Sequence, residues 1–287
     1  MIIDKLFEAV KAKGHVCLGL DTDFSYLPET YSAQFPSKGV AVLNFNKALI
    51  DATIDVVACY KVQIAYYEAL GMDGLTAYAS TLRYIREKGG ISIADIKRGD
   101  IAKTAEMYAQ AHFTGDFEAD FITLAPYMGM DSIEPYLPYI QNAEKGIFVL
   151  IRTSNPGAAD FEYLDLKDGD KLYREVGRRI HESGLKYLGE CGYSSIGGVM
   201  GCTHSDEAVS MREYLKSMFF LIPGYGAQGG KAEDIALYLK DGNGGVVNAS
   251  RSILLAWQKV ENGTEQFAQA ARKEAIRMRD DILKHCK

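Results

Sequence analysis

The stretch Ile91-Ser92-Ile93-Ala94-Asp95-Ile96-Lys97-Arg98-Gly99-Asp100 places charged side chains where a buried strand should end. Its β-branched beginning, directly after two glycines, predicts a short strand that enters the core. Side chains alternate along a strand, so Asp95 and Lys97 share one face. Gly99 permits a turn, and Asp100 stands where a helix beginning near Ile101 would have its N-cap. An ion pair and a helix cap would explain these charges. Charged groups are, however, rarely placed at the edge of a core unless they have a function, which favours a functional interpretation.

The composition indicates a globular chain with enough apolar residues for a large core. The chain has 287 residues, of which 47% are hydrophobic, and its formal net charge is −6 without a run of lysine or arginine. A duplex-binding protein needs a basic face, so nucleic acid is not expected as a partner. An anionic ligand would have to be held by a local pocket.

The cysteines and the amino terminus indicate where the protein works. The five cysteines are scattered and have no C-x-x-C spacing, which predicts reduced thiols and neither a disulfide framework nor a zinc site. Residues 3–10 read as an amphipathic helix and not as a signal peptide. No apolar run approaches the ~18 to 20 residues of a membrane span. We therefore expect a soluble, cytoplasmic protein without a membrane partner.

Apolar strand patterns and amphipathic helix patterns alternate eight times along the chain. The expected strands cover residues 15–20, 56–60, 91–94, 121–126, 147–151, 197–202, 218–223 and 245–249. Strands with near-continuous apolar character between helices indicate a parallel sheet. Eight such units in this length predict a closed (β/α)8 TIM barrel, forming a single domain over residues 1–287 with an extra N-terminal helix.

A barrel of this kind brings the residues at the strand exits together at its carboxyl-terminal mouth. The polar residues at the expected exits are Asp21, Lys61, Gln63, Asp95, Lys97, Ser154, Gln228 and Arg251. Lys61 and Lys97 alternate with the carboxylates of Asp95 and Asp100, and each lysine should stay protonated beside these acids. Such a cluster suits the delivery of a proton to a developing carbanion, and it does not suit a Schiff base, which needs a neutral amine.

The segment after the seventh strand has the composition of a phosphate-binding loop. Residues 224–230 contain four glycines, which free the backbone to turn its amides inward, and a helix begins near Lys231. A glycine-rich loop alone is often only a turn. Arg251 follows the next strand, where barrels commonly hold phosphate, and its guanidinium offers two parallel donors. Together these features favour phosphate binding.

These motifs in this order resemble the orotidine 5′-phosphate decarboxylase family. The resemblance rests on Asp95-Ile-Lys97-Arg-Gly-Asp100-Ile101 with Thr104, on Lys61, on Pro223-Gly-Tyr-Gly-Ala-Gln228-Gly229-Gly and on Ser250-Arg251-Ser252. Residues 125–131 and 152–157 are most similar to the longer bacterial branch. The resemblance implies cofactor-free conversion of orotidine 5′-monophosphate to UMP and CO2, the last step of de novo pyrimidine synthesis.

The same resemblance implies a role for each site residue. Asp95 would lie against the substrate carboxylate, and Lys97 would stabilise and protonate the C6 carbanion. Lys61 and Asp21 would hold the ribose hydroxyls and order the charges. Ser154, or Thr153 beside it, would contact the pyrimidine. The other implied substrate-binding residues are Pro223, Gln228, Gly229 and Arg251, of which Gln228 and Arg251 would hold the phosphate.

The resemblance further implies a homodimer, in which Asp100, Ile101 and Thr104 reach into the site of the neighbouring subunit. Two other functions stay open. A magnesium-dependent sugar-phosphate decarboxylase or synthase of the same superfamily should have an extra carboxylate ligand after the second strand, where this chain has Lys61 and Gln63. A non-catalytic phosphometabolite-binding barrel would not need a lysine between two acids. The five histidines show no paired ligand spacing, so no metal is expected.

Overall fold

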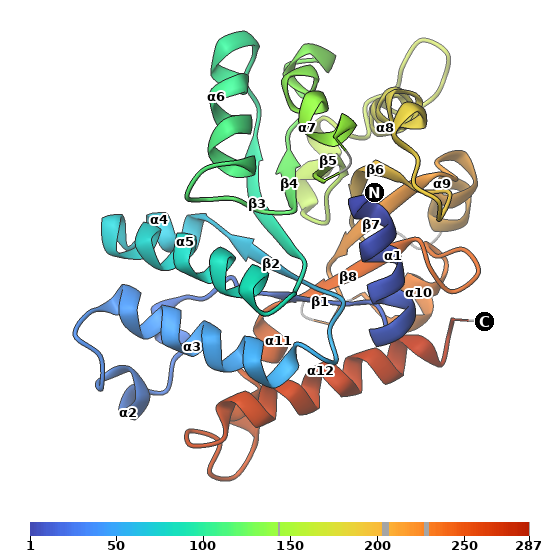
Figure 1. The fold of residues 1–287 in the computed structure, drawn as a ribbon. Helices are drawn as coiled ribbons and strands as arrows, with labels where there is room; N and C mark the ends of the chain where they lie inside the picture. Colours follow the sequence, from blue (N-terminus) through green and yellow to red (C-terminus); the bar gives the residue numbers. More distant parts are fainter. Residues whose placement is uncertain (143, 203–206, 227–229, 287) are drawn as a thin grey trace.

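The computed structural model describes residues 1–142, 144–202, 207–226 and 230–286. Eight parallel strands close into one barrel in the order β1 to β8, with the helices outside it (Figure 1). The strands are β1 Val16–Gly19, β2 Cys59–Gln63, β3 Ser92–Arg98, β4 Phe121–Leu124, β5 Gly146–Arg152, β6 Ser194–Met200, β7 Met218–Pro223 and β8 Gly245–Ala249. The prediction of a (β/α)8 barrel is confirmed.

The helices follow the strands, but several are broken. They are α1 Ile2–Lys13, α2 Glu29–Ser32, α3 Lys38–Thr53, α4 Ala65–Glu68, α5 Gly71–Glu87, α6 Ala102–Phe113, α7 Leu137–Gln141, α8 Leu172–Gly184, α9 Ala208–Tyr214, α10 Ala232–Ala236, α11 Arg251–Leu254 and α12 Phe267–Leu283. The helix expected over 65–88 divides at Gly71, which has φ +67°. The helix expected over 131–140 is instead a series of 3-10 turns and α7, because Pro135 and Pro138 lack backbone donors.

The amino-terminal end of the barrel is closed by α1. Ile3 and Leu6 of this helix are fully buried. They pack with the side chains that fill the amino-terminal half of the barrel, among them Phe121, Phe148 and Phe219. Each buried aliphatic side chain of this kind contributes about 1.5 to 3 kcal/mol. A second apolar core lies between the strands and the outer helices. The carboxyl-terminal end is thus the end at which a ligand can enter.

The strands near the charged motifs differ from the expected ones. β2 and β3 begin later and run further, so that Lys61, Asp95 and Lys97 lie within strands and not after them. The expected N-cap role of Asp100 is wrong. The chain passes Ile101 in an extended conformation, and α6 begins at Ala102 with Ile101 as its N-cap. The Asp100 carboxylate instead accepts the N–H of Ile101 at 2.8 Å.

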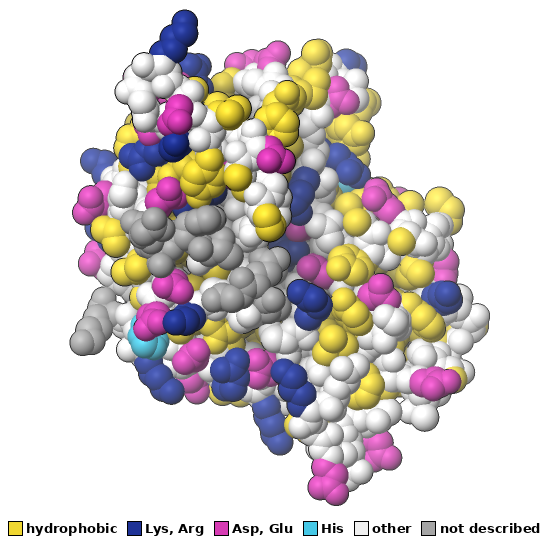
Figure 2. All heavy atoms as spheres, turned by 180° about the vertical axis from the view of Figure 1, so that it is seen from behind, with side chains coloured by type: hydrophobic (Ala, Val, Ile, Leu, Met, Phe, Trp, Pro, Cys, Tyr) yellow, Lys and Arg dark blue, Asp and Glu magenta, His cyan; other side chains and the backbone are white. Residues whose placement is uncertain are grey.

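Two further sequence expectations concern the surface and the thiols. None of the helices within the described ranges is both long enough and apolar enough to cross a membrane. All five cysteines are free. Figure 2 shows lysine, arginine and acidic side chains interspersed over one face of the molecule. The charge on that face is mixed, whereas duplex binding requires a basic face.

Candidate active site

A cavity of about 490 Å³ opens at the carboxyl-terminal ends of the strands. The structure places every predicted exit residue that it describes around this cavity, in a ring that follows the strands of the closed barrel. Its lining includes Asp21, Lys61, Gln63, Asp95, Lys97, Ser154, Pro223 and Arg251. Gln228 and Gly229 lie outside the described residues. The barrel therefore gathers side chains that are far apart in the sequence into one site.

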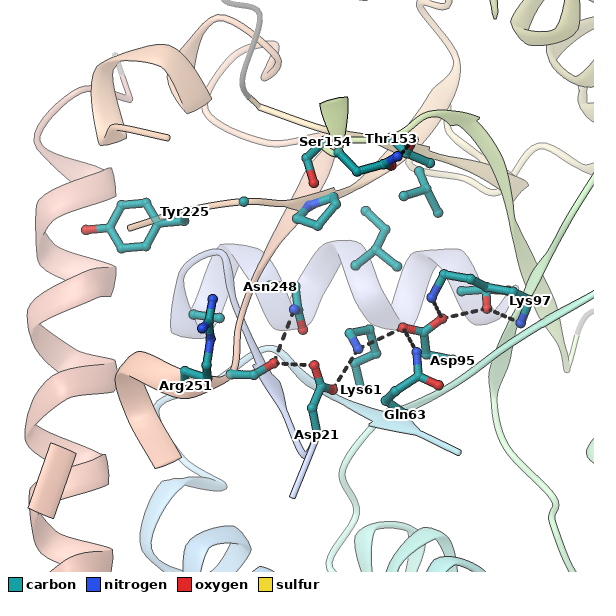
Figure 3. A pocket seen from close by; sticks show the side chains of 18 of the residues that line it. Asp21, Lys61, Gln63, Asp95, Lys97, Thr153, Ser154, Tyr225, Asn248 and Arg251 are labelled. Atoms are coloured by element: carbon teal, nitrogen blue, oxygen red, sulfur yellow. Dashed lines mark hydrogen bonds and ion pairs between the residues drawn. The ribbon is translucent and has the colours of Figure 1, made fainter. Parts of the chain in front are cut away.

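Four charges form a continuous row along one wall of this cavity (Figure 3). The Lys61 ammonium donates to Asp21 Oδ1 and to Asp95 Oδ2, at 2.9 Å in each case. Lys97 Nζ donates to Asp95 Oδ1 at 2.6 Å. The row arises because β1, β2 and β3 are neighbours and Gln63 pairs with Asp95 across the sheet. Negative and positive groups alternate as predicted for Lys61, Asp95 and Lys97, but the second carboxylate of the row is Asp21 and not Asp100.

The environment keeps the buried members of this row charged. Burial disfavours the charged form of Lys61, but Asp21 and Asp95 outweigh that effect and raise its pKa. Burial likewise disfavours the carboxylate of Asp95, but the ammonium groups of Lys61 and Lys97 lower its pKa well below the usual range. At neutral pH the Lys61 ammonium and the Asp95 carboxylate are both ionised.

Asp95 is held by four donors, two on each oxygen. Besides the two lysines, Gln63 Nε2 donates to Oδ2 at 2.9 Å and the Thr123 hydroxyl donates to Oδ1 at 2.9 Å. The Gln63 carbonyl is itself fixed, because it accepts the N–H of Ala65 at 3.2 Å. A carboxylate with this many donors cannot rotate without losing several of them, so its orientation is set before any ligand arrives.

The backbone of Lys97 is strained. Its φ is +45°, which is rare for a residue with a side chain and costs about 1 to 2 kcal/mol. The cause is an irregularity in the pairing of β3 with β4. From Ala94 to Arg98 β3 advances four residues, whereas β4 advances two, from Ile122 to Leu124. Strained residues persist where the surroundings fix them, and they gather at functional sites.

Two residues that complete this wall, Thr123 and Ser250, were not among the predicted site residues. Thr123 is a polar residue within the otherwise apolar strand Phe121-Ile-Thr-Leu124, and that exception was its only signal. Ser250 was part of a quoted motif without an assigned role. Its hydroxyl donates to Asp21 Oδ2 at 2.8 Å. Ser250 thus occupies the Asp21 oxygen that Lys61 does not contact.

The opposite end of the cavity is built from the segments after β7 and β8. Pro223, Gly224, Tyr225 and Arg251 line it, and Figure 3 shows Tyr225 and Arg251 on the far side from Lys97. Gly224 has φ +108°, which only glycine adopts readily. The Tyr225 hydroxyl donates to Asp281 of α12 at 2.7 Å, which anchors Tyr225 to that helix. The helix expected near Lys231 is α10, which has only five residues and can add little dipole.

The exit of β5 distinguishes Thr153 from Ser154. The N–H of Thr153 donates to Glu162 Oε2 at 2.9 Å, and its hydroxyl lies 2.7 Å from two acceptors of the same loop, Glu162 Oε1 and Asn155 Oδ1. Thr153 is therefore committed to closing its own loop. In Figure 3 the Ser154 side chain points toward the cavity.

Asp100, Ile101 and Thr104 do not line the cavity. They lie before and at the start of α6. The Ile101 side chain is 42% exposed, and nearby hydrophobic residues are exposed as well, with Met107 at 47% and Tyr127 at 88%. The row of charges in this chain is thus assembled without Asp100.

The fold and the site define an enzyme of the (β/α)8 barrel class, with alternating lysines and carboxylates at its mouth. A family model described as the orotidine 5′-phosphate decarboxylase / HUMPS family matches residues 14–265. The chain belongs to this family.

Two curated relatives and one solved structure agree with that assignment. Proteins named orotidine 5′-phosphate decarboxylase from Clostridium acetobutylicum and Clostridium kluyveri are 63% and 61% identical to this chain over 284 residues. That alignment covers 99% of this chain in each case, and 99% and 98% of the relatives. The structure of Leishmania donovani OMP decarboxylase matches with a TM-score of 0.73 and 28% identity, covering 97% of this chain and 98% of its own.

Proposed function

We propose that the row of charges carries out the decarboxylation of orotidine 5′-monophosphate to UMP and CO2, with no cofactor in the reaction. The decarboxylase activity itself, a carboxy-lyase reaction of pyrimidine biosynthesis, follows from the family and from relatives that are 57% to 63% identical over nearly the whole chain. The observation that carries the proposed mechanism is the Lys97 ammonium, which lies 2.6 Å from the buried Asp95 carboxylate and faces the cavity.

The chemistry needs a site that favours a carbanion. When the bond between C6 and the carboxylate breaks, the electron pair stays on C6 and CO2 leaves. The Lys97 ammonium then gives its proton to C6, which forms UMP and leaves a neutral amine to be reprotonated from solvent. Asp95 would face the substrate carboxylate, and the approach of two negative groups would disfavour the bound substrate more than the transition state.

Fixed charges in a mouth with little water can lower such a barrier, because their orientation costs nothing at the moment of reaction. The uncatalysed reaction is so slow that the site must supply stabilisation above ~20 kcal/mol, near the upper limit for enzymes. Binding of the distant phosphate can add to this by driving closure over the substrate. The separation of Arg251 from Lys97 in the cavity is consistent with phosphate binding at one end and proton transfer at the other.

The remaining substrate contacts are assigned from the resemblance to the family, and the lining of the cavity supports them. Asp21 and Lys61 would hold the ribose hydroxyls. Ser154 is our choice for the pyrimidine contact, because Glu162 and Asn155 engage the N–H and the hydroxyl of Thr153. Arg251 is our choice for the phosphate, together with Pro223 and with Gln228 and Gly229, which lie outside the described residues.

We also propose that the enzyme is a homodimer in which Asp100, Ile101 and Thr104 complete the partner's site. Their position at the start of α6, outside their own cavity, supports this arrangement. The exposed Met107, Tyr127 and Met128 supply apolar area of the kind that subunit contacts bury. Three further expectations remain parts of this proposal. We propose a single domain over residues 1–287 and a cytoplasmic location, which the free cysteines support. We propose no nucleic-acid partner, which the net charge of −6 supports.

The two alternatives fit the chain less well. A magnesium site would need open carboxylate oxygens, whereas both Asp21 and Asp95 are engaged by Lys61 and by further donors. The relatives at 57% to 63% identity are named as decarboxylases of orotidine 5′-phosphate, not as sugar-phosphate enzymes or binding proteins.

The test is Lys97→Ala, measured by an absorbance assay of decarboxylation. We expect the fold and UMP binding to be retained and turnover to fall by several orders of magnitude, since the variant lacks the proton donor. Lys88→Ala, at the far end of α5, is the matched control and should leave turnover unchanged. Near-normal turnover of Lys97→Ala would remove the proposed role. Loss of wild-type activity in EDTA would favour the magnesium-dependent alternative, and UMP binding without any turnover of orotidine 5′-monophosphate would favour the binding protein.

A further inference from the structure

Thr123 occupies an unusual place among the residues of the site. It lies within β4 between Ile122 and Leu124, and its side chain is 1% exposed while still lining the cavity. Its hydroxyl makes three hydrogen bonds. It accepts the N–H groups of Ile96 and Lys97, at 3.0 and 2.9 Å, and donates to Asp95 Oδ1 at 2.9 Å.

The number of bonds fixes the direction of each one. A threonine hydroxyl has one proton and two acceptor positions. Backbone N–H groups can only donate, so Ile96 and Lys97 use both acceptor positions. The proton must therefore point to the Asp95 carboxylate. If the Thr123 hydroxyl turned its proton away from Asp95, it would lose this bond and disturb the bonds from Ile96 and Lys97. These two N–H groups therefore fix its donation to Asp95.

The irregular pairing of β3 explains why a side chain is needed here. Asp95, Ile96 and Lys97 all lie opposite the single residue Thr123, because β3 advances four residues while β4 advances two. One strand residue cannot offer ladder partners to three residues of its neighbour. The Thr123 hydroxyl supplies acceptors for two of these amides. In this way the side chain stabilises the segment in which Lys97 has φ +45°.

We infer that Thr123 is a positioning residue for the decarboxylation, whose hydroxyl fixes both the left-handed backbone of Lys97 and the carboxylate that the Lys97 ammonium contacts. The inference rests on the proposed role of Lys97. Both ends of that lysine depend on one hydroxyl, since its N–H donates to Thr123 and its Nζ donates to the same Asp95 oxygen as Thr123 does. No contact of Thr123 with substrate is required.

Loss of the hydroxyl should therefore affect turnover and spare binding. A displacement of about 1 Å in a reacting group can lower a rate about 10²-fold. Arg251 and Tyr225 lie at the other end of the cavity and share no hydrogen bond with Thr123. We expect Thr123→Val to lower kcat about 10²-fold while KM and the Kd of UMP stay within about threefold.

Two further variants make this result specific. Thr123→Ser keeps the hydroxyl and should restore kcat to within about tenfold of wild type. Thr53→Val is the matched control, because Thr53 is also fully buried and its hydroxyl bonds Leu49 O at 2.6 Å and the Tyr60 hydroxyl at 2.9 Å, away from the cavity. It should lose stability but keep kcat. If Thr123→Val does not fold, Thr123→Cys is the substitute and should show the same selective loss of kcat.

The outcomes separate this inference from the proposed function. An unchanged kcat in Thr123→Val, beside an inactive Lys97→Ala, would overturn the positioning role alone. The same holds if Thr53→Val loses as much kcat as Thr123→Val, or if KM rises as strongly as kcat falls. A fully active Lys97→Ala would overturn the proposed function and this inference with it.

Discussion

Replacing Lys61 with methionine removes the central positive charge of the row and leaves the volume of the site filled. The Lys61 and Asp95 side chains are 6% and 8% exposed, so water cannot replace the lost ammonium at Asp95. Removing one partner of such a buried pair costs about 3 to 5 kcal/mol. The Asp21 side chain is 22% exposed and will regain water, so we expect a loss of stability at the lower end of this range. At about 2 to 4 °C per kcal/mol, a loss near 3 kcal/mol lowers Tm by about 6 to 12 °C.

The pH dependence of this loss identifies its cause. In the wild type the lowered pKa of Asp95 adds stability above about pH 4, the value for an unfolded aspartate, and that stability is lost as the pH falls through the folded value. In Lys61→Met only one ammonium, that of Lys97, and the hydrogen bonds from Gln63 and Thr123 still oppose the effect of burial, so the folded pKa of Asp95 rises. Lowering the pH then protonates Asp95 in the variant and removes its buried negative charge. The stability gap to wild type should narrow on acidification, by at most about 1.4 kcal/mol per pH unit.

The measurement is urea unfolding of both proteins at one protein concentration, from pH 8 down to pH 4.5, since subunit association would shift the midpoint. Lys88→Met is the matched control, because its ion pair with Asp51 lies in solvent and should change stability little. A variant as stable as wild type at pH 8 would refute the reasoning. A gap of constant size at every pH would show that the charge of Asp95 is not its source.

Two further predictions concern the phosphate and the partner subunit. Arg251→Ala should chiefly raise KM in a steady-state assay, because Arg251 lies far from Lys97 in the cavity (Figure 3); an unchanged KM with a lowered kcat would contradict the assignment. Inactive Lys97→Ala and Asp100→Ala proteins, mixed under conditions of demonstrated subunit exchange, should regain part of the activity if the sites are shared. A mixture that stays inactive would remove Asp100 from the partner's site.

The arrangement of the strands was accessible from the sequence because it depends on periodicity. β7 and β8 begin and end where the apolar runs do, and every described polar residue at an expected strand exit lines the cavity. Chain order and strand direction are sufficient for this, since parallel strands in a closed barrel all end at one mouth. The pairing of Lys61 with Asp21 and Asp95 follows from the adjacency of β1, β2 and β3.

Details set by contacts between strands were not accessible. The cap assigned to Asp100 assumed a regular strand that ended before Asp95, whereas β3 continues to Arg98 and moves the start of α6 to Ala102. Thr123 gave only the signal of one polar residue in an apolar run, which is equally typical of a satisfied core hydroxyl. Its function depends on the offset between β3 and β4, which neither strand reveals alone.

The offset also changes the reason why Asp95 and Lys97 meet. In a regular strand they would share a face by alternation alone. Here three residues lie opposite one, and the backbone at Lys97 is left-handed, so alternation no longer guarantees the contact. The 2.6 Å approach of Lys97 Nζ to Asp95 survives because Thr123 binds the backbone of one residue and the carboxylate of the other. A strained backbone held by a buried hydroxyl gives a fixed ammonium, which a relaxed strand with a flexible lysine would not provide.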